Sequence, residues 1–329
     1  MQIPPDDPRL LPVQLRRELL GQGETDRTLA AALKAGRLDR PRRGAYCHAP
    51  AWLALSDEEK YAVRCRAAYQ QSCTGVVLSH VSALPFHGGP LWGLATDEVH
   101  LTRADGLSGR REAGIRRHRG SLYDGDVVEI HGLSVMSALR ATLEVSMFGA
   151  TEAALAVANH FLHEGEFSSA ELRERYERSM NHWPESGPTE VMIRLADPRI
   201  ESVGESRSLY FFYQHGFPKP VPQYEVRDGD RVIARLDFAF PDLGFWVEFD
   251  GRVKYDAHLR PGETPVDVVL REKRREQQIA EATGWRCFRI TWADLAEPER
   301  LARRLRAFMR SVAAERSRRL VGPPDLAAG

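Results

Sequence analysis

The chain has 329 residues, of which 43% are hydrophobic, and this suits a globular protein of about two or three domains. Its 46 basic and 46 acidic side chains cancel, so net charge does not indicate nucleic-acid binding, although local patches can still support it. No run of about 20 apolar residues is present and the first ten residues lack an apolar signal-peptide core, so we expect a cytoplasmic protein without a membrane span.

The first fifty residues predict a small winged-helix-like unit. A short amphipathic helix is indicated by LPVQLRRELL, a turn by GQGET, and a second helix by DRTLAAALKAG, with Thr25 or Asp26 as its cap and Gly36 at its end. A basic turn and a strand follow in RLDRPRRGAYC. Two helices and a basic wing are a common DNA-binding arrangement, so residues 1–50 are a candidate DNA-binding unit. An ordinary helical hairpin with a solvated arginine cluster is the alternative. The wing residues that would contact DNA are Arg40, Arg42 and Arg43.

Residues 51–183 predict a mixed region of helices and short strands. Helical periodicity runs through EEKYAVRCRAAYQ, SALRATLEVSMFG and TEAALAVANHFL, and short strands are indicated by EVHLTR, GIRRHRG and DVVEIHGLSVMS. His80 and His87 could suggest a metal site, but no third ligand stands at a convincing spacing, so structural histidines are the favoured interpretation. The four cysteines form no CxxC pair, which argues against a structural zinc site and a disulfide framework.

A domain boundary is predicted at NHWPESGPTE, from Asn181 to Glu190, because this segment contains two prolines and a glycine. Residues 189–319 then predict one mixed sheet with helices packed against it, and residues 320–329 a disordered tail. The expected order is a helix in ESVGESRSLYFFYQHG, a hairpin in PQYEVRDGDRVIARLDFAFPD, a strand in FWVEFDG, a helix in DVVLREKRREQQIAEATG, a strand in WRCFRITW and a closing helix. The overall class is therefore α+β or α/β.

Acidic side chains gather at the ends of two predicted strands. Side chains alternate along a strand, so Asp237 faces away from Phe238, and Glu248 and Asp250 share one face. Neighbouring strands would bring these acids together, where only a cation or a shared proton makes their proximity tolerable. Oxygen ligands of this kind suit Mg²⁺. A charged solvent-exposed face is the alternative, although Trp246 flanks the acids.

Glu205 is a fourth candidate, on the helix that precedes the hairpin. It shares a helical face with Leu209 and Phe212, which points it toward the sheet. The spacing from Ser202 to Glu205 also fits a capping box, in which the carboxylate only satisfies a backbone N–H. Both interpretations stay open.

The order of these motifs resembles the PD-(D/E)XK nuclease superfamily, with a leading helix that carries a glutamate, then an aspartate, then Glu-x-Asp/Lys. More narrowly, the segments GESRSLYFFYQHGFPKPVPQYEV, VEFDGRVKY and GWRCFRITWADL resemble an uncharacterised domain family related to very-short-patch-repair endonucleases, over roughly residues 202–310. The upstream segments RRGAYC, VLSHVSALPFHG and GLSVMSALRATLEV resemble the winged-helix antitoxin domain of AbiEi-type abortive-infection systems. The resemblance implies a restriction-endonuclease-like αβββαβ core behind an antitoxin-like middle region.

One position departs from the superfamily pattern. A lysine would be expected where this chain has Asp250. The resemblance therefore leaves Lys254, six residues after Glu248, to fill the lysine's role from a shifted position, or else it implies an inactive site.

The resemblance implies a Mg²⁺- or Mn²⁺-dependent DNA endonuclease that acts in defence or repair. Asp237 and Glu248 would hold the metal, with Asp250 and Glu205 in support, and Lys254 would orient the attacking water or contact the phosphate. The DNA backbone would be neutralised by Arg271, Arg274, Arg275 and Arg289. One alternative is a non-catalytic, antitoxin-like transcriptional regulator with a degenerate nuclease fold, and another is an interaction module without nucleic acid. The expected partners are DNA and either a toxin or a second copy of the chain.

Overall fold

A computed structural model of the chain describes residues 4–72, 75–103, 109, 111–112, 114–180, 186–251 and 265–321. It divides into two compact units, Met1–Pro198 and Arg199–Gly329. Both units contain helices and sheets, so the predicted mixture of α and β structure is confirmed. Within the described ranges, no helix is long and apolar enough to cross a membrane.

Unit 1 begins with two short helices and a three-stranded antiparallel sheet in the order β1-β3-β2. Thr25 caps α2, because its side chain accepts a hydrogen bond from the Thr28 N–H. Gly36 follows this helix with φ +64°, a left-handed conformation that favours glycine. The elements of this part are η1 (Pro8–Leu10), β1 (Gln14–Leu15), α1 (Arg16–Gly21), α2 (Asp26–Lys34), β2 (Leu38–Arg42), β3 (Ala45–His48), α3 (Ala49–Leu53) and α4 (Asp57–Gln71).

The rest of unit 1 is a six-stranded sheet in the order β6-β7-β5-β4-β9-β8, with helices α5 to α8 after it. Strand β5 pairs with β7 in parallel, and β4 pairs with β9 in parallel, while the other neighbours are antiparallel. The elements are β4 (Val76–Leu78), η2 (His80–Ser82), η3 (Leu84–His87), β5 (Val99–Arg103), β6 (Arg111–Glu112), β7 (Ile115–Arg119), β8 (Val127–Ile130), β9 (Leu133–Met136), α5 (Ala138–Phe148), α6 (Thr151–His163), α7 (Ser169–Ser179) and α8 (Gly187–Leu195).

The predicted separation of residues 1–50 from residues 51–183 differs from the observed division. Helix α4 contacts strands of both sheets, and the two predicted regions share one hydrophobic cluster. Its buried members are Val13, Leu15, Ala45, Leu55, Val63 and Ala67. Shared burial of this kind joins the two regions into one compact unit.

The predicted domain boundary is also displaced. Residues 181–185 lie outside the described ranges, but α8 packs on α5 and α6 of unit 1. Thr189 of α8 is buried, and its Oγ1 lies in a 2.8 Å hydrogen bond with Oγ of Ser146 on α5. Unit 1 ends at Pro198 and unit 2 begins at Arg199, because buried contacts rather than local composition decide which core a helix joins.

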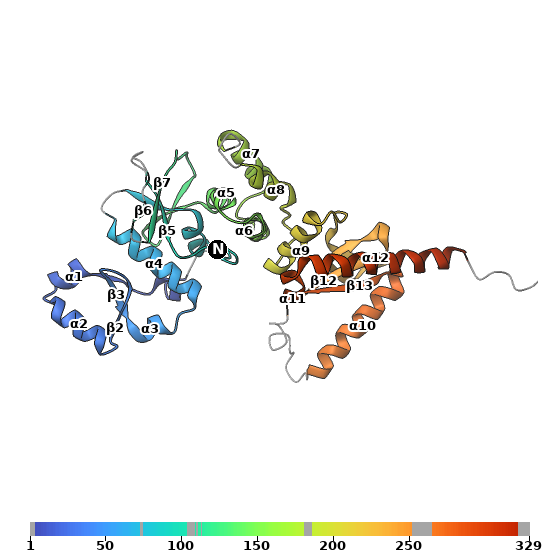
Figure 1. Ribbon diagram of the computed structural model, residues 1–329, viewed down its shortest axis with the longest axis horizontal. Helices are drawn as coiled ribbons and strands as arrows, with labels where there is room; N and C mark the ends of the chain where they lie inside the picture. Colours follow the sequence, from blue (N-terminus) through green and yellow to red (C-terminus); the bar gives the residue numbers. More distant parts are fainter. Residues whose placement is uncertain are drawn as a thin grey trace, which may run out of the picture. The chain divides into compact units, whose positions relative to one another are not determined.

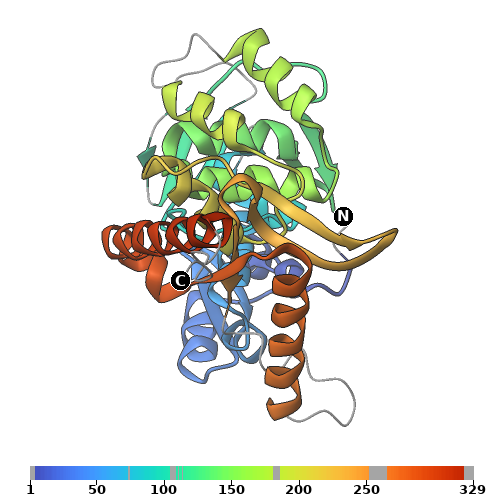
Figure 2. The ribbon, with the colours of Figure 1, turned by 90° about the vertical axis from the view of Figure 1, so that its right-hand side faces the viewer.

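Unit 2 is built on a four-stranded sheet in the order β10-β11-β12-β13. Strand β11 is antiparallel to both of its neighbours, β10 and β12, whereas β13 runs parallel to β12. Figure 1 labels β12, β13 and the helices α9 to α12, and Figure 2 shows the orange α10 and the red α12 running in different directions from the sheet. The elements are α9 (Val203–Gln214), β10 (Val221–Asp228), β11 (Arg231–Phe240), η4 (Pro241–Leu243), β12 (Phe245–Asp250), α10 (Pro265–Thr283), β13 (Arg286–Thr291), α11 (Trp292–Ala296) and α12 (Pro298–Val321).

Helices cover both faces of this sheet. Ile279 of α10 packs in a cluster with Ala239 and Trp246 on one face. On the other face, the Phe212 ring of α9 lies 5.4 Å from Phe238, and the Phe308 ring of α12 lies 5.7 Å from Phe245. The apolar side chains therefore lie on two covered faces, but β11 does not alternate along its whole length, because Leu236 joins Ala239 and Trp246 in one cluster instead of sharing the face of Phe238.

The predicted tail begins inside a helix. Helix α12 continues to Val321, so residues 320–321 are helical and not part of a tail. Residues 322–329 lie outside the described ranges.

Candidate functional site

The predicted acids come from three elements of unit 2. They are Glu205 in the first turn of α9, Asp237 on β11, and Glu248 and Asp250 on β12. Phe238 of β11 pairs with Val247 of β12, and the next step of this antiparallel register leads to Asp237 and Glu248. The two strands expected to be neighbours are therefore neighbours, and two of the acids come from adjacent positions on them.

Asp237 has an environment unlike that of a surface carboxylate. Its Oδ2 accepts a hydrogen bond of 2.8 Å from the backbone N–H of Phe249. Burial, together with the negative charges of Glu205 and Glu248, raises the pKa of Asp237 to about 7, against the opposing effect of the Phe249 N–H. A cation beside this carboxyl group would favour its charged form.

Glu205 is buried, with 7% of its surface exposed, and both interpretations of it have support. The Ser202 hydroxyl accepts from the Glu205 N–H and donates to the Glu205 carboxylate at 2.7 Å, as a capping role requires. The same carboxylate accepts a hydrogen bond of 2.9 Å from Nε2 of Gln223, and its charge acts on Asp237. Glu205 therefore caps the helix and also belongs to the acidic group.

Gln223 was not among the predicted site residues. It lies on β10 with φ +50°, a left-handed conformation that is uncommon for a residue other than glycine. Strained backbone of this kind concentrates at functional sites, and here it accompanies the side chain's contact with Glu205. Neither periodicity nor spacing singles out this glutamine in the sequence.

The close approach of α9 to β12 depends on Gly204. A Cβ atom at this position would lie 1.9 Å from Cε1 of Phe249, far inside van der Waals contact. Glycine therefore lets the start of α9, with Glu205, sit directly against the end of β12.

Glu248 is held by an arginine of α10. Nη1 of Arg275 lies 3.0 Å and 3.1 Å from the two carboxylate oxygens of Glu248, and Nη2 donates to the carbonyl of Arg235 at 2.6 Å. A cavity of about 30 Å³ lies beside them, lined in part by Trp246 and Cys287. Any metal that used Glu248 would have to replace Arg275 as its counter-charge.

The remaining two candidates lie at the end of β12 and beyond it. Asp250 is half-buried and pairs with Thr291 in the parallel register with β13. Lys254 falls outside the described residues, so its role stays a prediction from the sequence.

The acids fit a magnesium site by their chemistry. Mg²⁺ is usually held by one or two carboxylates and several waters, and Asp237 and Glu248 supply two oxygen ligands on adjacent strands. They do not form a closed cage with Asp250. Across the described part of the chain, the one group of three histidines, cysteines or acids whose ligand atoms lie within 4.8 Å of one another is elsewhere, in unit 1.

The arginines expected to bind DNA in unit 2 differ in their availability. Arg274 is exposed on α10, whereas Arg275 is engaged with Glu248. Arg289 of β13 pairs with Glu276 at 2.9 Å and with a second glutamate of α10 at 3.7 Å. Arg271 lies half-buried on the same helix. Contacts with phosphate by Arg275 and Arg289 would therefore compete with their ion pairs.

The wing arginines of unit 1 are divided in the same way. Arg40 and Arg43 are exposed at the hairpin of β2 and β3. Arg42 is half-buried between them, and burial lowers its pKa, with the charge of Arg117 adding to the effect. Arg40 and Arg43 are thus the members of this group that face solvent.

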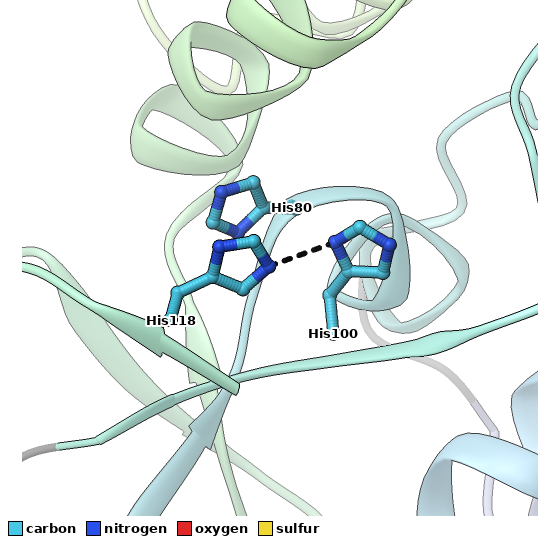
Figure 3. Close-up of side chains that lie close together, drawn as sticks. All are labelled: His80, His100 and His118. Carbon is cyan, nitrogen blue, oxygen red and sulfur yellow. Dashed lines mark hydrogen bonds between the residues drawn. The ribbon is translucent and has the colours of Figure 1, made fainter. Parts of the chain in front are cut away.

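Three histidines that the sequence left apart meet in unit 1. His80, His100 and His118 each place one ring nitrogen within 4.8 Å of the others (Figure 3). Spacing in the sequence did not reveal these neighbours of His80, because β5 and β7 bring His100 and His118 together across the sheet. His87 does not belong to this group, and its Nε2 lies 2.7 Å from the carbonyl oxygen of Met136.

Comparison with known proteins finds two relatives, and their names give no activity. No protein-family model matches the sequence. Two proteins of Mycobacterium tuberculosis, from strains CDC 1551 / Oshkosh and ATCC 25618 / H37Rv, are each 33% identical to the chain over 115 residues. The match covers 35% of this chain and 39% of each relative, and both relatives are named as uncharacterised.

Proposed function

We propose that unit 2 is a metal-dependent, nuclease-like domain that hydrolyses phosphodiester bonds in DNA. The observation that carries the proposal is the gathering of acids from α9 and from the two inner strands β11 and β12. The charges of Glu205 and Glu248 and the burial of Asp237 all raise the pKa of its carboxyl group. Acids kept together against their mutual repulsion are characteristic of sites that bind a cation or move a proton.

The topology supports the same proposal. Helix α9, three antiparallel strands, helix α10 and a parallel fourth strand follow in the order that the resemblance to PD-(D/E)XK nucleases implies. Fold alone does not determine activity, so the argument rests on the acids rather than on the sheet.

The roles of the residues follow from their contacts. Asp237 and Glu248 would hold Mg²⁺ or Mn²⁺, which supplies activation of water and neutralisation of phosphate charge when bound. Glu205 is fixed by Ser202 and Gln223 and sets the charge that acts on Asp237. Arg275 holds Glu248 in the absence of an ion and becomes available to a phosphate once that pair opens.

The proposal is tested by incubating supercoiled plasmid with the purified protein and Mg²⁺ or Mn²⁺ at low salt. Wild-type protein is expected to nick or linearise the plasmid, and Glu248→Ala to abolish this without loss of fold. Glu281→Ala is the matched control, because it removes an exposed glutamate of α10 that does not line the cavity beside Glu248. Equal cleavage by wild type and Glu248→Ala would show that these acids are not the catalytic group.

A DNA-binding regulator without catalysis is the second candidate. Two observations favour it: Arg275 already neutralises Glu248, and the helices α1 and α2 precede a hairpin that exposes Arg40 and Arg43. Such a protein would retain DNA through the wing and would be indifferent to Glu248→Ala.

A further inference from the structure

The three histidines of unit 1 form a compact group on the six-stranded sheet. His80 begins η2 directly after β4, His100 lies on β5 and His118 on β7 (Figure 3). Nε2 of His118 lies 3.0 Å from Nδ1 of His100, and the rings of His80 and His118 are stacked with their centroids 3.8 Å apart. His80 and His100 are buried and His118 is half-buried.

We propose that His80, His100 and His118 bind one divalent transition-metal ion of the Zn²⁺ class. Three imidazoles are borderline ligands that suit Zn²⁺, Co²⁺, Ni²⁺ or Cu²⁺ rather than Mg²⁺. The site lies in unit 1, so this inference goes beyond the proposed nuclease function and does not depend on it.

The separation of the His118 and His100 nitrogens fits an ion, whereas the His80 ring, which is stacked on His118, would have to turn before its in-plane lone pair pointed at the same ion. Two nitrogens bound to Zn²⁺ at about 2.0–2.1 Å in a tetrahedral arrangement stand about 3.3 Å apart. The His118 and His100 nitrogens are 3.0 Å apart, and all three ligand atoms lie within 4.8 Å. Metal binding would replace the His118–His100 hydrogen bond and would release or relocate the ring proton that this bond holds.

A buried carboxylate orients His80. Oε2 of Glu144 accepts a hydrogen bond of 2.9 Å from the His80 backbone N–H and lies 3.3 Å from its Nδ1. Oε1 of Glu144 accepts a hydrogen bond of 2.9 Å from Nε of Arg140. Nδ1 of His80 also lies 3.0 Å from Oγ of Ser79, so this nitrogen has two polar neighbours of the kind that metal-bound histidines use, and Nε2 of His80 is left for the ion.

The backbone at His80 is strained. Its φ of +54° is left-handed, which costs about 1–3 kcal/mol for a residue other than glycine. The contact with Glu144 accompanies this conformation, in which the His80 ring stacks on His118. Backbone strain of this kind is expected where a side chain must be held at a fixed position.

Space for a further ligand lies beside the group. A cavity of about 260 Å³ is lined by His80 and His100 together with Asp97, Glu98 and Arg116. A three-histidine site with an open fourth position admits water or a small anionic ligand.

The test is a titration of the full-length chain with Co²⁺ after treatment with a chelator. In the presence of excess Mg²⁺, which occupies any carboxylate site, we expect one bound Co²⁺ per chain, a visible d–d spectrum without a thiolate charge-transfer band, and displacement by Zn²⁺. His118→Ala should weaken binding at least about 100-fold, because it removes one of three ligands. His48→Ala is the matched control, since it removes an exposed histidine of the same unit.

Two results would overturn the proposal. One is the absence of a Co²⁺ spectrum in the wild type, and the other is binding by His118→Ala that equals that of His48→Ala. Circular dichroism shows whether His118→Ala folds. If it does not, Glu144→Gln takes its place, with an expected loss of affinity of about 10–100-fold at unchanged stoichiometry. Unchanged affinity in that variant would count equally against the site.

Discussion

Asp237 of the candidate site is expected to lower the stability of the folded protein as the pH rises. Its carboxyl group is shielded from water and lies near two other acids, so its pKa rises from an ordinary 3.8 to about 7. Between about pH 4 and pH 7 the unfolded chain ionises this group while the folded protein keeps it protonated. The free energy of unfolding therefore falls across this range, and the loss is complete above about pH 7.

Asp237→Asn is expected to stabilise the protein at pH 8 and to leave its stability at pH 4 nearly unchanged. The amide keeps an oxygen for the Phe249 N–H but cannot ionise. A rise of about three pKa units corresponds to at most about 4 kcal/mol, and we expect a gain of roughly 1–3 kcal/mol at pH 8. Urea unfolding at both pH values measures it.

The comparison variant is Asp230→Asn, which alters an exposed aspartate in the turn of the same unit. It should change the unfolding free energy by less than about 0.5 kcal/mol at either pH. A gain for Asp237→Asn that is equal at pH 4 and pH 8 would mean that charge is not its cause.

At the scale of elements, the packing of α9 on β12 fixes where Glu205 lies. Gly204 is the point of contact, because the ring of Phe249 occupies the space of a side chain there. A helix that moved outward to make room would carry Glu205 away from Asp237.

Gly204→Ala is expected to destabilise unit 2 by about 1–3 kcal/mol, because the added methyl group overpacks the contact with Phe249. Thermal or urea unfolding measures the loss. Gly21→Ala is the control, since this helical glycine has open space around its Cβ position. The double variant Gly204→Ala/Phe249→Leu should recover part of the loss, and no recovery would place the strain elsewhere.

Local signals in the sequence predicted several elements well. The Thr25 cap, the turn at Asp228-Gly229 and the closing helix α12 are all present. Each depends on residues close in the chain, where capping and turn chemistry act. The boundary at residues 181–190 was misplaced because α8 joins unit 1 through buried contacts such as Thr189 with Ser146, which no local pattern reveals.

The candidate sites were predictable to different degrees for the same reason. Alternation along β11 and β12 was enough to suggest that Asp237 and Glu248 approach each other. The pairing of Arg275 with Glu248 and the meeting of His100 with His118 depend on how a helix and a parallel strand dock. Those contacts are set by tertiary packing, so spacing in the sequence pointed away from the histidine group.

At the scale of the whole molecule, the basic and acidic side chains are equal in number, but the arginines differ in whether they are paired with acids or exposed. Arg275 and Arg289 of unit 2 are engaged with glutamates, whereas Arg40 and Arg43 of unit 1 are exposed. If the chain binds DNA, the β2–β3 hairpin should therefore supply more of the phosphate contacts than α10 does.

The double variant Arg40→Ala/Arg43→Ala is expected to weaken DNA binding and to reduce its dependence on salt. Each lost phosphate contact lowers the slope of log K against log[salt] by about 0.9, so the slope should fall by about 2. Fluorescence anisotropy with a labelled duplex at several salt concentrations measures both effects. Arg173→Ala/Arg178→Ala removes the same charge from two exposed positions on α7. Equal losses of DNA affinity in the two double variants would assign the effect to overall charge. A loss of affinity confined to Arg40→Ala/Arg43→Ala, with unchanged binding by Glu248→Ala, would favour a DNA-binding role that is independent of the acids.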